Sequence, residues 1–359
     1  MNIFVFGSSI ASCYWNGAAT YYRGIYKHLH ALGHNITFAE PDAYGRQQNV
    51  DDGVRDYVDV VVYGSQQLDH LLQRASSADL VIKHTGVGLN DELLEKEVLR
   101  CRSENTRVAF WDVDAPATLS RVEADASDPF RGLIPQYDLV FTYGGGEAVV
   151  REYLRLGARN CHPIYNALDP ETHHPVMPDE EMRCDLLFVG NRLPDRERRV
   201  EEFLIRAAAL APDCSFILGG EGWEGKPLPA NVRRIGHVST KDHNRLNSSA
   251  RMVMNINRDS MADVGFSPPT RIFEAAGAGA CVITDSWNGI SEFFAPRQEI
   301  LIATGAEDVV AYLSSISPQQ ASAIGDQMRR RALRDHTYAQ RAVEIQAVLE
   351  QRQLSEQAA

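Results

Sequence analysis

Two stretches of sequence decide the expected fold: DLLFVGNR at residues 185–192 and NIFVFGSS at residues 2–9. Each is a short apolar run that ends in a glycine and is followed by polar residues leading into a helical pattern. The same arrangement therefore occurs once near the start of each half of the chain. We interpret the two stretches as the first strands of two similar units.

Outward from these stretches, short β-rich runs alternate with amphipathic helical stretches, which is typical of parallel sheets covered by helices on both faces. We expect strands at 2–6, 35–39, 78–83, 107–112, 137–143, 184–192, 214–220, 231–238, 250–257, 280–285 and 299–303. We expect helices at 17–32, 64–76, 90–101, 145–156, 195–211, 240–249, 269–278 and 305–315, and from about 318 onward. The pattern predicts an α/β fold of two Rossmann-like, doubly wound domains that face a central cleft.

The segment NALDPETHHPVMPDEE (166–181) is rich in proline and acidic residues and poor in core-forming ones, so we interpret it as the interdomain linker. A chain of 359 residues also exceeds what one hydrophobic core usually serves. We predict an N-terminal domain over 1–168 and a C-terminal domain over 169–336. The last helix, 337–359, is expected to pack back onto the first domain.

Composition excludes several classes of protein. No apolar run approaches the ~20 residues that span a bilayer, and the first residues lack the basic segment of a secretion signal, so we expect a soluble, cytoplasmic protein. The six cysteines are scattered singly, without zinc-site spacing. A net charge of -12 argues against general nucleic-acid binding. The cluster of His28, His30 and His34 lacks an accompanying carboxylate, and we expect no metal site.

The loop GNRLPDRERR (190–199) follows the first strand of the expected second domain. Gly190 lets the backbone approach a ligand, and Arg192 and Arg196 could meet a diphosphate. Alternatively, this segment is a solvated helix start, which we consider the better interpretation for Arg196, Arg198 and Arg199. We favour Arg192 as the phosphate contact.

A second loop, in NINRDSMADVGFSPPTRIFEAAGAGACVITD (255–285), leads into a helix expected to begin near Pro268 or Pro269. The free N–H groups of that helix start, with Arg271, would form a site for a diphosphate without a metal ion. The carboxylate of Glu274 could accept hydrogen bonds from the two hydroxyls of a ribose. Alternatively, Arg271 and Glu274 form an ordinary surface pair at i, i+3.

The stretch TRIFEAAGAGACVITDSWNGISEFF (270–294) resembles the donor-site signature of GT-B glycosyltransferases. FVGNR (188–192), ILGGEGW (217–223) and SPPTRIFEAAGAGA (267–280) resemble the CgeB or spore-maturation-protein group more closely. The resemblance covers most of 135–335. It implies a glycosyltransferase that binds a nucleotide-diphosphate sugar with its C-terminal domain and a hydroxyl-bearing acceptor with its N-terminal domain, with no cofactor beyond the donor substrate.

The resemblance also implies roles for particular residues. It places the donor phosphates by the loop after the first strand of the second domain and the nucleotide base by the loop after the third strand. The ribose would bind at the Ala/Gly-rich helix. We also assign Ser267 and Thr270, at the start of that helix, to donor binding. The expected donor-binding residues are Gly190, Asn191, Arg192, Gly219, Gly220, His237, Val238, Ser267, Thr270, Arg271 and Glu274.

One position departs from the family pattern. Many retaining members of the family carry a glutamate eight positions before the ribose-binding one, where this chain has Phe266. Asp259 or Asp263 could substitute for that acid, although either can equally be a surface residue. Whether transfer retains or inverts the configuration of the sugar stays open. A non-catalytic sugar-nucleotide-binding or structural protein on this fold, or a sugar-nucleotide epimerase, is the alternative function.

Catalysis requires positive charge beside the departing diphosphate, which we assign to Arg192, Arg271 and the helix N-terminus, with Arg271 as the catalytic residue. An inverting enzyme also requires a base. Asp112 and Asp114 in AFWDVDAPATL (109–119) follow a strand and are our candidates for that base. Alternatively, they cap the next helix or bind backbone amides. His84 also ends a strand, and we rank it below the aspartates.

The first loop, GSSIASCYWNGAATYYRG (7–24), contains glycines but no Gly-x-Gly-x-x-Gly pattern, which argues against a nicotinamide or flavin site. Its aromatic residues Tyr14, Trp15, Tyr21 and Tyr22 resemble a wall on which a sugar stacks or an acceptor binds, although some of them are expected to be core. We assign Tyr14, Trp15 and His84 to acceptor binding.

Overall fold

The computed structural model describes residues 1–14, 16–51, 53–86 and 89–357, with side chains described as far as residue 351. The chain divides into two compact units. The first unit comprises Met1–Asn166 together with the segment from Tyr338 onward, and the second comprises Ala167–Thr337. The boundaries expected from the sequence were 168/169 and 336/337.

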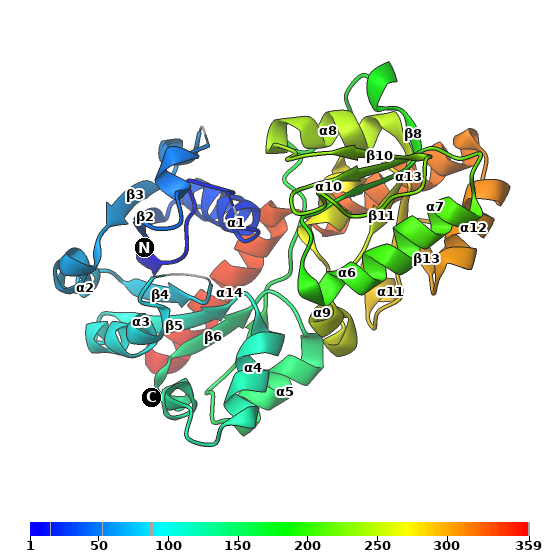
Figure 1. Ribbon diagram of the computed structural model, residues 1–359. Coiled ribbons are helices and arrows are strands. Elements are labelled where there is room, and N and C mark those ends of the chain that lie inside the picture. Colours follow the sequence, from blue (N-terminus) through cyan, green and yellow to red (C-terminus); the bar gives the residue numbers. More distant parts are fainter. Residues whose placement is uncertain (15, 52, 87–88, 358–359) are drawn as a thin grey trace. The chain divides into compact units, whose positions relative to one another are not determined.

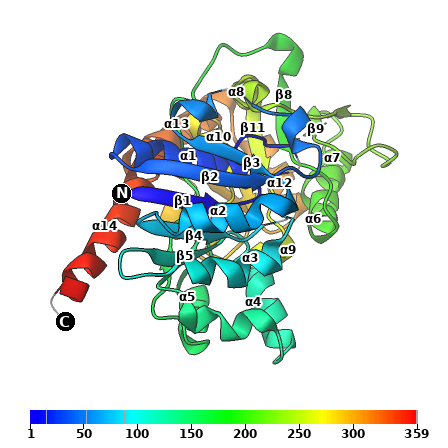
Figure 2. The ribbon, with the colours of Figure 1, turned by 90° about the vertical axis from the view of Figure 1, so that its left-hand side faces the viewer.

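The first unit is built on a parallel sheet of seven strands in the order β3-β2-β1-β4-β5-β6-β7. Figure 2 shows β2, β1, β4 and β5 stacked in this order. The strands are β1 (Asn2–Phe6), β2 (Asn35–Pro41), β3 (Asp59–Tyr63), β4 (Leu80–His84), β5 (Arg107–Asp112), β6 (Leu139–Thr142) and β7 (His162–Pro163). The helices are α1 (Ala19–Ala31), α2 (Leu68–Ala75), α3 (Asp91–Glu97), α4 (Ala115–Ala124), α5 (Gly146–Arg155) and α14 (Tyr338–Gln357).

The second unit has a parallel sheet of six strands in the order β10-β9-β8-β11-β12-β13. The strands are β8 (Cys184–Val189), β9 (Phe216–Gly219), β10 (Val232–Ile235), β11 (Ala250–Asn255), β12 (Val282–Asp285) and β13 (Leu301–Ala303). The helices are α6 (Pro194–Val200), α7 (Ala207–Leu210), α8 (Thr240–Ser249), α9 (Asp259–Val264), α10 (Thr270–Gly277), α11 (Ile290–Phe293), α12 (Ala306–Ser315) and α13 (Pro318–Asp335). A π-helical stretch, Glu201–Arg206, joins α6 to α7.

In both sheets the direction of strand addition reverses once. The reversal lies between β1 and β4 in the first unit and between β8 and β11 in the second. Ligands of such sheets bind beyond the carboxyl ends of the strands at this point of reversal. The expectation of two parallel, doubly wound α/β sheets is confirmed.

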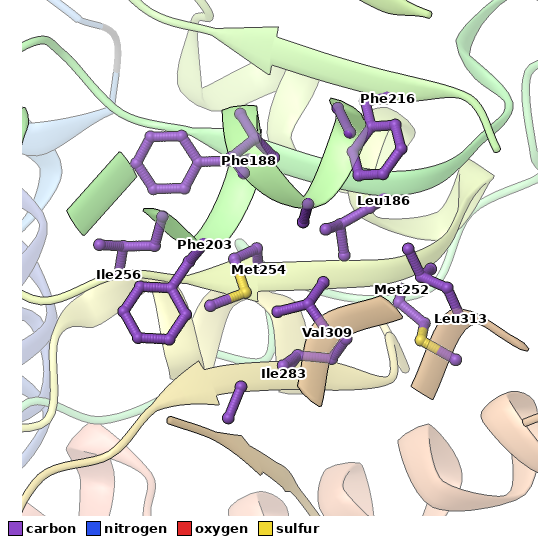
Figure 3. Close-up of a cluster of buried hydrophobic side chains, with 14 of the residues drawn as sticks. Leu186, Phe188, Phe203, Phe216, Met252, Met254, Ile256, Ile283, Val309 and Leu313 are labelled. Atoms are coloured by element: carbon purple, nitrogen blue, oxygen red, sulfur yellow. The ribbon is translucent and has the colours of Figure 1, made fainter. Parts of the chain in front are cut away.

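The core of the second unit fixes the strands that carry its loops. Figure 3 shows side chains of β8, β11 and β12 packed against those of α12 and the π-helical stretch. Residues two apart on a strand point to the same face, which explains why Leu186 and Phe188 of β8 join this cluster together with Met252 and Met254 of β11. Their burial holds the carboxyl ends of β8 and β11 in a fixed position.

Helix α14 belongs to the first unit although it ends the chain. In Figure 1 this red helix lies beside the blue helix α1. The ring of Tyr338 packs on Gly24 of α1, where an added Cβ would overlap the ring, and its centroid lies 6.1 Å from that of Tyr21. Arg107 of β5 donates from Nη1 to the carbonyl of Leu349 at 3.1 Å.

In the part of the chain that the structure describes, no helix is both long enough and apolar enough to cross a bilayer.

Candidate functional site

The loops after β8, β9 and β10 of the second unit are hydrogen-bonded to one another at the carboxyl edge of the sheet. The amide of Gly190 donates to the carbonyl of Gly219 at 2.9 Å, and that of Gly220 donates to the carbonyl of Gly236 at 3.0 Å. Gly220 has a φ of 115°, and a Cβ there would lie 2.5 Å from the oxygen of Gly190. Only glycine fits this close approach of two loops without strain.

The side chain of Arg192 is paired within this loop cluster. It donates to Glu197 at 2.9 Å from Nε and at 2.6 Å from Nη2. Hydrogen bonds from Arg192 and then from Lys226 lower the pKa of Glu197 to about 2. The charge of Arg192 is thus largely compensated. Its neighbour Asn191 fixes the loop, since its Oδ1 accepts from the amide of Glu221 at 3.0 Å.

Two other arginines converge beneath Gly190. Arg271, at the start of α10, donates from Nε to the carbonyl of Val189 at 2.6 Å, and its Cζ lies 5.1 Å from the ring centroid of Phe188. Arg196, from α6, donates to the carbonyl of Asn191 at 2.5 Å, and its Cζ lies 5.7 Å from the same ring. A Cβ on Gly190 would lie 2.9 Å from Nη2 of Arg271 and 3.1 Å from Nη2 of Arg196.

Both guanidinium groups are desolvated. Burial, and then the charge of Arg271, lowers the pKa of Arg196 to about 9. Burial also lowers the pKa of Arg271, although Glu274 and then Asp285 oppose the shift. The Nε of Arg196 has no hydrogen-bond partner among the described residues. The structure thus places two guanidinium groups, one buried and one half-buried, beside the backbone of Gly190.

Glu274 lies one turn after Arg271 on α10 and is almost fully buried. Its Oε2 lies 3.5 Å from Nδ1 of His243 on α8, and its Oε1 lies 3.9 Å from Nε2 of His173. Burial raises the pKa of this carboxyl, but the hydrogen bond from His243 and the charges of His243, His173 and Arg271 outweigh it, and the pKa falls to about 2. Glu274 is therefore ionised at neutral pH.

A glycine on α10 lets the chain segment that carries His173 lie against the helix. A Cβ on Gly277 would lie 2.5 Å from the carbonyl oxygen of His173 and 2.5 Å from Cδ1 of Leu168. The side chain of Asn244 on α8 clamps the same segment, since it donates to the carbonyl of Thr172 at 2.8 Å and accepts from the amide of His174 at 3.2 Å. The small residues of α10 thus have a packing role at this site.

The remaining donor-site candidates lie around this group with different exposure. His237 is exposed, whereas Val238 and Thr270 are half-buried. Ser267 is buried, and its hydroxyl donates to the carbonyl of Gly265 at 3.0 Å. Phe266 has a φ of 46°, and its ring lies where a Cβ on Gly289 would be.

The two acids considered as substitutes for the acid missing at position 266 lie on α9. Asp259 is ion-paired with Arg199 at 2.6 Å. Asp263 is exposed. Neither position indicates a contact with a donor sugar.

In the first unit, the structure buries Asp112 at the end of β5. Its carboxylate accepts from the hydroxyls of Tyr153 at 2.5 Å, Thr85 at 2.9 Å and Thr118 at 3.1 Å, and from the amide of Asp114 at 2.9 Å. Burial raises the pKa of Asp112, and these four donors oppose the shift. Asp112 thus holds together the segments around it, whereas Asp114 is half-buried at the N-terminus of α4.

The acceptor-site candidates of the first unit separate into buried and exposed residues. His84 is buried, with its Nε2 2.5 Å from the hydroxyl of Tyr26, and burial followed by the charge of Lys83 holds its pKa well below the usual value. Tyr14 is 38% exposed, whereas Tyr21 and Tyr22 are core residues. Trp15 lies outside the described residues.

The structure thus brings Gly190, Arg271 and Glu274 to one edge of the second sheet. It adds three residues that the sequence analysis missed or set aside, namely Arg196, His173 and His243. A signal for Arg196 existed, because its position in the first turn of α6 follows the Gly190 loop directly. No sequence signal linked the two histidines to Glu274, because tertiary packing alone brings the linker and α8 to α10.

Residues 196–347 match the model of a family described as glycosyl transferase-like. HepE from Anabaena, solved with UDP and glucose, has a TM-score of 0.71 and 14% identity, covering 98% of this chain and 100% of that chain. Sucrose-phosphate synthase from Thermosynechococcus elongatus has a TM-score of 0.69 and 13% identity, covering 99% and 100%. An α-glucosyltransferase solved with UDP and a 13-mer DNA has a TM-score of 0.68 and 13% identity, covering 96% and 98%.

The fold is that of the GT-B glycosyltransferases. A search of curated proteins gave no match. The segment matched by the family model includes Arg196, Arg271 and Glu274 and begins just after the Gly190 loop. The GT-B fold and the family match together support a glycosyltransferase. The closer grouping with CgeB or spore-maturation proteins stays a prediction.

Proposed function

We propose that this protein is a glycosyltransferase that moves a sugar from a nucleoside-diphosphate donor to a hydroxyl group of an acceptor. The observation that carries the proposal is the pair of desolvated guanidinium groups, Arg271 and Arg196, at the backbone of Gly190. A diphosphate at this position would form charge-assisted hydrogen bonds with both groups. Two positive charges there would also stabilise the departing nucleoside diphosphate, so that transfer would require no metal ion.

The nucleotide would extend from the diphosphate along the edge of the second unit. Glu274 is ionised, so its carboxylate would accept hydrogen bonds from the ribose hydroxyls. The exposed His237 and the half-buried Val238 lie at the end of β10, where a base could contact them. UDP is the first nucleotide to test, because HepE and the α-glucosyltransferase were both solved with it.

The acceptor would bind the first unit, where Tyr14 is exposed and Asp114 is half-buried at the carboxyl edge of the sheet. We retain Asp114 as the candidate base. Asp112 is less suited to that role, because four donors already surround its buried carboxylate. Whether the configuration of the sugar is retained would be read from the anomeric proton of the product by NMR.

The test is calorimetric titration of the protein with UDP, GDP, ADP and TDP and their common sugar conjugates, without added metal. We expect saturable binding of one nucleotide family. Arg271→Ala and Arg196→Ala should each weaken that binding at least tenfold, or roughly 1.4 kcal/mol, since each removes a charged hydrogen-bond donor.

Arg192→Ala is the matched control, because Arg192 lies in the same loop but is paired with Glu197. Its affinity should stay within a few-fold of wild type, and circular dichroism should show all three variants folded. If Arg192→Ala loses affinity while Arg196→Ala keeps it, the diphosphate lies at Arg192 instead. Nucleotide binding without hydrolysis or transfer of the sugar would favour a non-catalytic nucleotide-binding protein.

A further inference from the structure

Three side chains with metal-binding atoms converge on the second unit from distant parts of the sequence. His173 comes from the segment that enters the unit, His243 from α8 and Glu274 from α10, and one ligand atom of each lies within 4.8 Å of the other two. The imidazole rings stack, with centroids 6.0 Å apart and an angle of 25° between their planes. Such a set of two imidazoles and one carboxylate is a common ligand set of zinc.

The hydrogen bonding of His173 gives an independent reason to expect a ligand. Its side chain is 2% exposed, and Asn244 offers the ring a side-chain hydrogen bond. The amide of Asn244 also binds the backbone of Thr172 and His174, and among the described residues no hydrogen bond of Nε2 of His173 is found. Buried polar atoms are normally satisfied, and leaving one unsatisfied costs free energy. The Nε2 atom of His173 faces the carboxylate of Glu274, where a bound ion would satisfy it.

The backbone that carries His173 is held in place. The side chain of Asp169 accepts from the amide of Glu171 at 3.1 Å and from the hydroxyl of Thr172 at 2.9 Å, and Gly277 leaves room for the backbone of His173 against α10. A ligand on a held backbone is favourable for metal binding, because little conformational entropy is lost when the ion binds.

We propose that His173, His243 and Glu274 bind a divalent transition-metal ion of the Zn²⁺ class, with a fourth position open to water or another ligand. Bonds of about 2.0–2.1 Å in a tetrahedral site would bring the ligand atoms to about 3.3 Å from one another. The present distances from Glu274 are 3.5 Å to His243 and 3.9 Å to His173, and all three ligand atoms lie within 4.8 Å of one another, so the side chains would have to rotate inward to complete the site. The 22% exposure of the His243 side chain gives the ion a path of entry.

Metal binding would also affect the nucleotide. If Glu274 holds the ribose, as the proposed function requires, an ion on the same carboxylate would compete with the nucleotide. This consequence rests on the proposed function, whereas the metal site itself rests only on the three side chains. Zn²⁺ would then act as an inhibitor of donor binding.

The experiment is titration of the full-length, tag-free protein with ZnCl₂ and separately with MgCl₂, followed by calorimetry and by competition with a chromophoric chelator. We expect one Zn²⁺ per chain and no comparable binding of Mg²⁺, because imidazole nitrogens suit zinc and magnesium prefers oxygen ligands. His173→Ala, His243→Ala and Glu274→Gln should each lower the Zn²⁺ affinity at least tenfold. Zn²⁺ should raise the melting temperature of the wild type and not that of His243→Ala.

His174→Ala is the matched control, since it removes an exposed imidazole from the same segment and should keep full Zn²⁺ affinity. His243 lies on the surface side of the cluster, so His243→Ala keeps the test valid if the buried His173 variant fails to fold. Equal Zn²⁺ affinity of His243→Ala and wild type, or no saturable binding at all, would overturn the proposal. Titration of the metal-free protein with UDP tests the nucleotide site separately, so either proposal can fail alone.

Discussion

Arg192 and Arg196 lie four residues apart but have different surroundings. The sequence favours Arg192 as the phosphate contact and a solvated position for Arg196. In the structure Arg192 forms an ion pair with Glu197, whereas the guanidinium group of Arg196 lies over the ring of Phe188 and is desolvated. Sequence spacing alone does not predict that Arg196 packs on Phe188, because Phe188 belongs to a strand and Arg196 to the helix that follows it. By contrast, the start of the helix that carries Arg271 and Glu274 is predictable from the sequence, because a polar loop with two prolines precedes it, and α10 begins at Thr270.

A buried carboxyl of the first unit makes the stability of the protein depend on pH. The side chain of Glu95 on α3 is 5% exposed, with Nη2 of Arg121 at 3.4 Å. Burial raises the pKa of Glu95 from 4.5 to about 7, although Lys83 and Arg121 oppose the shift. Between these two pH values the folded protein binds more protons than the unfolded chain, so its free energy of unfolding falls as pH rises through the window.

Glu95→Gln should remove this dependence, because glutamine is neutral at every pH in the window. The variant should match the wild type near pH 4.5 and exceed it at pH 8 by at most about 3 kcal/mol, the free energy that corresponds to the pKa shift. Urea unfolding at a series of pH values from 4.5 to 8 would measure the difference. Parallel stability curves for the two proteins would contradict the assignment.

At the scale of elements, the expected strands match the observed ones wherever the apolar run is long and buried. The stretches at 2–6, 107–112 and 250–257 correspond to β1, β5 and β11. The misses differ in their causes. β3 (Asp59–Tyr63) is a partly buried edge strand whose apolar run is as long as that of β1, so the sequence does carry a signal for it, whereas β7 (His162–Pro163) has two residues and no pattern to detect. The polar sequence of α9 (Asp259–Val264) was interpreted as loop.

Helix α10 depends on one small residue for its packing. Because a Cβ on Gly277 would lie 2.5 Å from both the backbone of His173 and the side chain of Leu168, Gly277→Ala should push the entering segment away from the helix. We expect a loss of about 1–3 kcal/mol in the free energy of unfolding of the second unit, as for other overpacked sites. Denaturant unfolding followed by hydrogen exchange in segment 167–175 would measure the effect.

Gly236→Ala is the control, since it lies in the same unit, a Cβ there meets only Oε1 of Glu221 at 3.9 Å, and the residue has no positive φ. It should leave stability unchanged or slightly raise it, by the lost freedom of the unfolded chain. An equal effect of both substitutions would show that Gly277 has no special packing role.

At the scale of the whole molecule, the two units have separate cores, and each core should respond to its own substitutions. Tyr338 of α14 is buried in the first unit, and Met328 of α13 is buried in the second. Tyr338→Ala should destabilise the first unit by about 3–5 kcal/mol and Met328→Ala the second by about 2–5 kcal/mol, as expected for cavities in a core.

Hydrogen exchange measured by mass spectrometry distinguishes the two units. In Tyr338→Ala, amides of β1, β4 and β5 should lose protection while those of β8, β11 and β12 keep it, and Met328→Ala should show the opposite. Equal loss of protection in both units for either variant would mean that they unfold as one cooperative body.

The return of α14 to the first unit has a consequence for synthesis of the protein. The second unit is a continuous segment, whereas the first unit is completed only by Tyr338 and the helix that it begins. Translation runs from the N-terminus, and domains generally fold as they emerge. The second unit therefore leaves the ribosome with all of its residues while the first unit still lacks the helix that covers Tyr21 and Gly24. The half of the protein that is made first is thus the last to finish folding.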